Sequence, residues 1–358
     1  MKTFKEVCRN NWYVIASTLL FLIPSEIFSG IISYGHIDDS YTVFDFWGNI
    51  LLRWAFLIGG ILLAYFSGGL LNHEGSGVLA LFLTLWVVIN RESSPSGETV
   101  FNILFVLALI SLSFYYVNTC GKSLLHTIFY YIMMAVLALY SEGKIEIFIV
   151  LISAVFLFAT KWMLVTSKPA RIVNYICTAL AVAVSGYLLA DILDTHIGII
   201  LSEGVKFHPE KVILTSRPFG EAICFGEIAE APYVYELTNV IGHFGNVAGK
   251  GMCAVIVLFV ASLFVKCFNF PGYVKPADIV ATTILSVKCI AGIFENYAII
   301  SGFDVRIPIL ADGKEGYLVF GLLLGYIFES RKNLDVMQGL WYKVFDIEKD
   351  KEEVPEDV

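Results

Sequence analysis

The sequence predicts an all-α polytopic membrane protein with about ten transmembrane helices. Of its 358 residues, 57% are apolar and 16% are charged, and the mean hydropathy is +0.75. Apolar runs of roughly 17–25 residues recur along the chain, which is the length a helix needs to cross a bilayer. One long polar stretch, residues 194–233, interrupts them. This pattern excludes an ordinary soluble domain, and the absence of a basic patch argues against a nucleic-acid partner.

Each predicted span is an apolar run bounded by polar or turn residues. The runs lie near 11–34, 44–68, 76–90, 99–117, 123–140, 145–165, 171–193, 234–266, 277–301 and 315–330. The first half of the eighth run, ELTNVIGHFGNVAGKG, is polar and glycine-rich, so we expect a broken or re-entrant piece that faces protein or water. Residues 1–332 should therefore form a single transmembrane domain, followed by an acidic tail over residues 333–358.

The distribution of basic residues predicts the orientation of the chain. With ten spans, the Lys and Arg of short connections fall on one side, at Lys2, Lys5, Arg9, Lys161, Lys168, Arg171, Lys266, Lys275, Arg331 and Lys332. Because basic residues favour the cytoplasmic side, both termini are expected in the cytoplasm. The long polar loop between spans seven and eight is then expected outside the membrane.

Charged residues at the ends of the spans mark the same outer face. The pairs are Arg91 and Glu98, Glu142 and Lys144, and Arg306 and Asp312. Solvated loop charge is one interpretation, since charges at span ends need no special reason. The other is an outward-facing cavity for a substrate with a diphosphate and hydroxyl groups, which basic residues and carboxylates would hold.

A few charges lie within the predicted spans. Lys288 and Glu295 are seven residues apart, about two turns on one helix face, and could form part of a polar track. Arg53 lies near the outer end of the second span, where a long basic side chain can reach the interface. Charges inside spans are costly and usually face a cavity or a partner.

The stretch from Ser301 to Lys332 resembles the C-terminal signature of the SEDS family, the membrane glycosyltransferases of the RodA, FtsW and SpoVE type. Residues 307–310 (IPIL) match the family's L-P-F-L segment, and residues 329–332 match its exit to the cytoplasm. Residues 311–313 (ADG) replace S-Y-G. A Leu-rich last span lies between these segments.

Further segments resemble the same family in the same order along the chain. Residues 94–110 resemble Q-P-S-E-L-A-K through Pro95, Ser96 and Glu98, and Arg91 stands for an Arg of the preceding segment. Residues 139–144 resemble Q-P-D-L-G-T, where Glu142 takes the Asp position and Lys144 is new. Three more segments match: residues 216–221 with S-G-G-L-F-G-K-G, residues 230–235 with P-E-A-H-T-D-F, and residues 240–245 with V-I-G-E-E-L-G.

The resemblance implies a cell-wall assembly protein for cell shape, division or sporulation. Family members polymerise peptidoglycan from lipid II at the outer face of the cytoplasmic membrane. The family's catalytic Asp corresponds here to Val234, so Glu230 and Glu236 become the candidate catalytic residues. The expected substrate-binding residues are Arg91, Glu98, Glu142, Lys144, Arg217 and Asp312.

The resemblance also implies partners and a cofactor. The partners are the lipid-linked disaccharide, membrane lipid and a single-span class B penicillin-binding transpeptidase. A divalent cation, Mg²⁺ or Mn²⁺, is the one cofactor expected, because it would hold the diphosphate leaving group. Two alternatives stay open: a catalytically inactive scaffold or regulator of wall synthesis, and a transporter of a lipid-linked or small polar substrate.

Overall fold

The computed structural model describes most of the apolar chain. The described residues are 4–35, 43–71, 76–93, 98–120, 123–141, 143–161, 165, 167–200, 209–220, 236–268, 276–300, 305–309 and 314–328. They form twelve α-helices and one short π-helix, and they include no strand. The predicted all-α fold is therefore confirmed over the part of the chain that the structure describes.

The helices follow the predicted apolar runs closely. They are α1 (Phe4–Gly35), α2 (Val43–Leu71), α3 (Ser76–Ser93), α4 (Glu98–Tyr115), the π-helix η1 (Tyr116–Cys120), α5 (Leu124–Leu139), α6 (Lys144–Lys161), α7 (Lys168–Ile200), α8 (Pro209–Thr215), α10 (Glu236–Phe244), α11 (Asn246–Phe268), α12 (Pro276–Asn296) and α13 (Lys314–Phe328). The polar stretch 194–233 is not all loop, because α7 continues to Ile200 and α8 lies within the stretch.

Six of the described helices are long and apolar enough to cross a membrane. Their spans are Asn11–Ser29, Trp47–Ser67, Val100–Thr119, Lys168–Ile192, Asn246–Cys267 and Pro276–Asn296. Three shorter apolar helices cover Ser76–Arg91, Leu124–Leu139 and Gly316–Phe328. The chain is thus a multi-pass membrane protein by its helix composition, whereas the count of ten spans and the orientation of the termini stay predictions.

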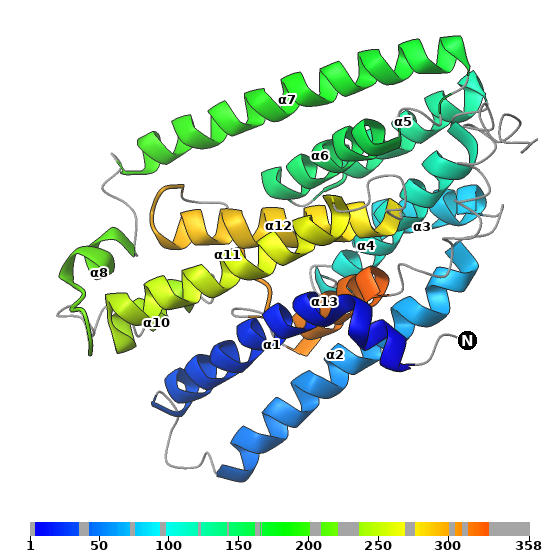
Figure 1. Cartoon of the computed structure of the whole chain (residues 1–358). Coiled ribbons are helices and arrows are strands. Elements are labelled where there is room, and N and C mark those ends of the chain that lie inside the picture. The colour runs from blue at the N-terminus through cyan, green and yellow to red at the C-terminus, as the bar shows by residue number, and fades with distance from the viewer. Residues whose placement is uncertain are drawn as a thin grey trace, which may run out of the picture.

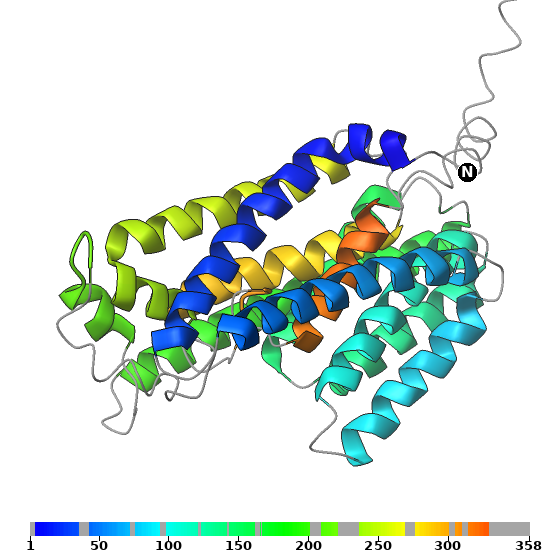
Figure 2. The same cartoon turned by 90° about the horizontal axis from the view of Figure 1, so that it is seen from below.

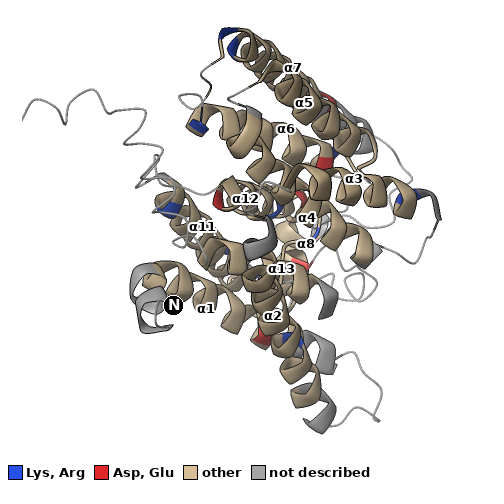
Figure 3. Cartoon of the chain, turned by 90° about the vertical axis from the view of Figure 1, so that its right-hand side faces the viewer, with Lys and Arg blue, Asp and Glu red and all other residues tan. Residues whose placement is uncertain are grey.

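The helices lie side by side in an elongated bundle, with α8 and α10 at the end opposite the first turn of α1 (Figures 1 and 2). Helix α7 lies at one edge and packs on α5 and α6. Charged positions are sparse on the described helices, as Figure 3 shows. Most of the outer surface can therefore face lipid.

The predicted eighth span, 234–266, is in fact two helices. Helix α10 ends at Phe244 and α11 begins at Asn246, with Gly245 between them at a φ of +94°. A side chain at Gly245 would lie 2.7 Å from the carbonyl oxygen of Pro218 and 2.8 Å from that of Arg217. Glycine is needed here both for the left-handed backbone and for the close approach of residues 216–220.

The tightest packing in the bundle joins α2 to α13. Gly60 and Ala64 of α2 face Gly321 and Gly325 of α13, and a Cβ atom added at Gly60 or Gly321 would overlap the backbone of the other helix. Small residues at such positions let two membrane helices approach backbone to backbone and gain close van der Waals contact. This contact brings the polar residues Arg53 and Tyr317 together, as described below.

We expect Gly321→Ala to destabilise the protein by about 1–3 kcal/mol, because the added methyl group must push α13 away from Leu57. The control is Gly186→Ala in α7, where an added Cβ meets nothing within 4 Å. That variant should unfold at the wild-type temperature or slightly above, since Ala favours helix more than Gly does. Thermal unfolding in detergent measures both, and equal unfolding temperatures for the two variants would contradict the packing argument.

Candidate functional site

Polar side chains lie along one buried face of α12. Lys288 and Glu295 are two turns apart, and Asn296 follows at the end of the helix. Glu295 and Asn296 are fully buried, whereas the Lys288 side chain is 28% exposed. The two predicted charges do share a helix face, but each has its partner on another element rather than pairing along α12.

The segment Val305–Ile309 runs beside this face in a non-helical conformation and ends in a turn at Pro308 and Ile309. The backbone N–H of Val305 donates to Oε2 of Glu295 at 2.7 Å, and Ile307 packs so closely on Gly292 that a Cβ there would overlap it. Pro308 reaches the neighbourhood of Lys288. Non-helical backbone is tolerated within a membrane bundle where protein encloses it, and Val305, Ile307 and Ile309 are all buried.

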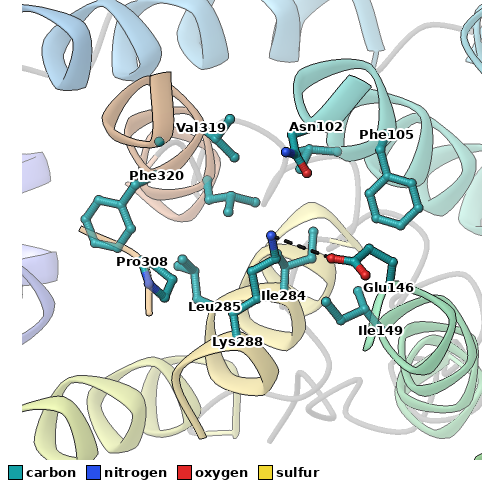
Figure 4. A pocket seen from close by; sticks show the side chains of 13 residues that line it. Asn102, Phe105, Glu146, Ile149, Ile284, Leu285, Lys288, Pro308, Val319 and Phe320 are labelled. Carbon is teal, nitrogen blue, oxygen red and sulfur yellow. Dashed lines mark ion pairs between the residues drawn. The ribbon is translucent and has the colours of Figure 1, made fainter. Parts of the chain in front are cut away.

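A small cavity opens between α4, α6, α12 and α13 beside Lys288 (Figure 4). Its volume is about 30 Å³, which is room for one or two water molecules. The walls are mostly apolar, and the polar side chains in them are Asn102, Glu146 and Lys288. The Nζ atom of Lys288 lies 3.9 Å from Oε1 of Glu146, so an ion pair joins α12 to α6 across the cavity.

Helix α10 is fixed to the end of α12 by hydrogen bonds between Thr238 and Asn296. The backbone N–H of Thr238 donates to Oδ1 of Asn296 at 3.0 Å, and the Thr238 hydroxyl donates to the Asn296 carbonyl at 2.8 Å. Asn296 in turn donates its amide to the Gly292 carbonyl at 2.8 Å. Because Glu236 is two residues before Thr238, these hydrogen bonds hold the first turn of α10, which begins with Glu236, at the end of α12.

A second polar cluster joins α1, α2 and α13. The Arg53 guanidinium binds Oε2 of Glu26 at 3.2 Å, reaches the Ser29 hydroxyl at 3.5 Å and lies 5.7 Å from the centre of the Tyr317 ring. The Glu26 side chain is only 7% exposed. Arg53 therefore forms a partly buried ion pair rather than simply extending toward the interface.

Glu236 lies outside the six candidate spans, at the first position of α10. Burial raises the pKa of its carboxyl from an ordinary value of 4.5 to about 7, and the positive charge of Arg53 partly offsets the shift. A carboxyl group with a pKa near neutrality can accept and release a proton at physiological pH. Glu236 thus has the protonation behaviour that a general base needs.

The structure describes three of the predicted substrate-binding side chains. Arg91 donates to the carbonyls of Leu139, at 3.1 Å, and Ser141, at 2.7 Å, and so caps the C-terminal end of α5. Lys144 pairs with Asp191 of α7 at 2.5 Å. Arg217 is exposed, and its carbonyl accepts the N–H of Asn246 at 2.8 Å at the start of α11.

Arg91 and Lys144 both lie at the connection between α5 and α6, and the predicted convergence of the outer loops stays a prediction. No described contact joins them to Arg217 or Glu236. Glu98 begins α4. The remaining residues that the sequence singled out, Glu142, Glu230, Val234 and Asp312, lie outside the described residues, so their places in the site stay predictions.

Sequence reasoning missed the partner residues Glu26, Asn102, Glu146 and Asp191. Glu26, Glu146 and Asp191 are acids within or beside apolar runs, and that signal could have marked them, since charges there usually have partners. Nothing in the sequence indicates which basic residue each acid meets. The described residues contain no group of three or more His, Cys, Asp or Glu that could hold a metal ion.

No family model matches the chain, and no curated protein matches it. The class that the fold and site define is therefore an all-helical membrane protein with buried ion pairs and a largely buried carboxyl group beside a polar helix face.

Arg53→Met should destabilise the protein by about 3–5 kcal/mol, because it leaves Glu26 buried without its positive partner. Lys144→Met is the matched control, since the Lys144 and Asp191 side chains are 39% and 36% exposed. Breaking that exposed pair should cost about 1 kcal/mol or less. Unfolding in denaturant measures the stability of both variants. Similar decreases in the free energy of unfolding would show that burial does not strengthen the Arg53–Glu26 pair.

The pH dependence of stability should report the Glu236 carboxyl. Its pKa is raised on folding, so its stabilising contribution is complete below pH 4.5 and is lost as the pH rises through 7. Glu236→Gln cannot titrate, and the variant should lose less stability than the wild type between these pH values. At pH 4.5 the two proteins should unfold at similar temperatures. Parallel pH profiles would contradict the assignment.

Proposed function

We propose that this protein is a bacterial cell-wall assembly protein of the SEDS type that elongates a glycan from a lipid-linked disaccharide, with Glu236 as its general base. The observation that supports the proposal is the raised pKa of the Glu236 carboxyl, which burial shifts to about 7. It directly follows the polar stretch 194–233, which we expect at the outer face of the cytoplasmic membrane. The motif resemblance supplies the substrate class.

In the proposed reaction, Glu236 accepts the proton from a hydroxyl group of the acceptor sugar. The hydroxyl oxygen forms a bond to the anomeric carbon of the donor, and the bond from that carbon to the diphosphate oxygen breaks. The proton stays on Glu236, and the electron pair leaves with the lipid diphosphate. A carboxyl with a pKa near 7 suits this step because it is both available as a base and able to hold the proton.

Among the three described side chains that the sequence predicted for substrate binding, we assign the diphosphate role to Arg217. Arg91 and Lys144 are bound to the α5 carbonyls and to Asp191, whereas the Arg217 side chain is exposed beside the junction of α10 and α11. The junction lies about 12 Å from Glu236 along α10, at 1.5 Å for each residue. An Arg at this position could hold phosphate oxygens in bidentate fashion.

The expected divalent cation finds no carboxylate cluster among the described residues, so we assign no step to it. Partnership with a single-span transpeptidase is part of the same proposal. The exposed apolar surface of the bundle is compatible with a neighbouring membrane helix, but no particular helix face argues for that partner.

A catalytically inactive scaffold or regulator is the second candidate. The specific observation in its favour is Val234, which stands where the resemblance implies the catalytic Asp and has no group that can accept a proton. Such a protein would bind the transpeptidase and the lipid-linked sugar without turnover. Transport of a lipid-linked or small polar substrate is the third candidate, and uptake into proteoliposomes tests it.

We expect Glu236→Gln to slow glycan polymerisation from lipid II at least about 100-fold, because the amide cannot accept the hydroxyl proton. Glu230→Gln and the double variant test the other candidate, and Glu227→Gln in the same polar stretch is the control that should keep wild-type activity. The assay runs in detergent, with and without Mg²⁺ or Mn²⁺.

Full activity of the Glu230→Gln/Glu236→Gln protein would overturn the catalytic assignment. An inactive wild type that still binds lipid II and co-purifies with a transpeptidase would favour the scaffold instead.

A further inference from the structure

The ion pair in the cavity of Figure 4 has no role in the proposed proton transfer. Figure 4 shows Lys288 directed from α12 toward Glu146 of α6, with Asn102 of α4 on the same side of the cavity. The surrounding walls are apolar and include Phe105 and Ile284. Placing a charged pair in such walls costs free energy unless its donors and acceptors are used. A polar group in the cavity would use these donors and acceptors.

The geometry of the pair leaves its hydrogen-bonding capacity unused. The 3.9 Å between Lys288 Nζ and Glu146 Oε1 exceeds the 2.7–2.9 Å typical of a charge-assisted hydrogen bond. Within the described residues, neither side chain makes a hydrogen bond to protein. The side chains are 28% and 20% exposed, so bulk water reaches them only in part.

The size and charge of the cavity restrict what can occupy it. A volume of about 30 Å³ admits a group of one or two non-hydrogen atoms. A phosphate oxygen would bring negative charge against Glu146, and an ammonium group would bring positive charge against Lys288. A hydroxyl group suits both partners, because its oxygen accepts from an ammonium while its proton is donated to a carboxylate.

We propose that Lys288 and Glu146 form a recognition site for one hydroxyl group of a sugar ligand. The hydroxyl oxygen accepts a hydrogen bond from Lys288 and donates its proton to a hydrogen bond with Glu146, while the Asn102 amide is available to a neighbouring ligand atom. The identity of the ligand as the lipid-linked sugar rests on the proposed function. The hydroxyl site itself rests on the cavity and the ion pair.

This site is separate from the general base. Lys288 precedes Asn296 by eight residues, which is about 12 Å along α12, and Asn296 is the residue that holds α10 beside Glu236. The hydroxyl group recognised at Lys288 is thus a different one from the hydroxyl that Glu236 would deprotonate. Its recognition would select the sugar and orient it, without any change of covalent bonds.

The test compares binding of two lipids that share the polyprenyl chain and the diphosphate, and a soluble disaccharide then isolates the sugar. Lipid II carries the disaccharide and peptide, and undecaprenyl diphosphate carries the same lipid and phosphates alone. The variant is Lys288→Met/Glu146→Leu, which removes both charges together so that neither is left unpaired and the fold is kept. Lys250→Met, an exposed position on α11, is the control.

We expect the double variant to bind lipid II at least about tenfold more weakly than the wild type, because two charge-assisted hydrogen bonds are lost. Its binding of undecaprenyl diphosphate should be unchanged, and the control should bind both lipids normally. Unchanged binding of lipid II by the double variant would overturn the proposed hydroxyl site, and water would then be the occupant of the cavity. An equal loss of affinity for both lipids would overturn the proposal as well, because the ion pair would then bind the diphosphate or stabilise the fold.

A soluble disaccharide, chitobiose, provides a measurement that does not depend on the lipid. It should raise the unfolding temperature of the wild type and of Lys250→Met, but not that of the double variant. A wild type that binds neither lipid would count against the proposed function alone, and chitobiose would then decide the hydroxyl site. No shift in the wild type, or an equal shift in the double variant, would overturn it.

Discussion

Glycines on α2 and α13 let two helix backbones touch, and the polar organisation of the bundle depends on that contact. Gly60 faces α13, and Gly321 faces α2, at positions where any side chain would overlap the opposite backbone. Leu318 packs on Gly60, and the ring of the preceding residue, Tyr317, lies beside Arg53. The close approach thereby places the guanidinium between α1 and α13, where it can neutralise the buried Glu26. Larger residues would separate the helices and leave these charges apart.

Three acidic side chains inside the bundle each interact with a group from another element of the chain. Glu26 meets Arg53, Glu146 meets Lys288, and the fully buried Glu295 accepts a backbone N–H from Val305. An unpaired charge inside a membrane costs free energy, so these interactions also favour the packing of the elements that carry the partners. The pairs differ in how many of their hydrogen-bond donors and acceptors remain unused. Lys288 and Glu146 stand too far apart for a hydrogen bond, and the proposed hydroxyl site rests on this separation.

Much of the fold was predictable because a helix in lipid must be long and apolar, and this requirement is visible residue by residue. The predicted run 99–117 became α4 with η1, and 277–301 became α12 with the turn that follows it. The polar, glycine-rich first half of the eighth run indicated an interruption, but hydropathy alone could not place it at the left-handed backbone of Gly245. The tertiary contact of residues 216–220 with this glycine decided the break between α10 and α11.

The candidate site divides in the same way. From the sequence alone came the membrane class, the likeness of several segments to the SEDS family, the unusual charges Arg53, Lys288 and Glu295, and Glu236 as a candidate base. The tertiary structure decided that Arg91 caps α5, that Lys144 binds Asp191, and that burial raises the pKa of Glu236. Hydropathy and motif spacing are local properties of the chain, so the sequence shows them directly. Ion pairing and desolvation arise between helices distant in sequence, so only their packing determines them.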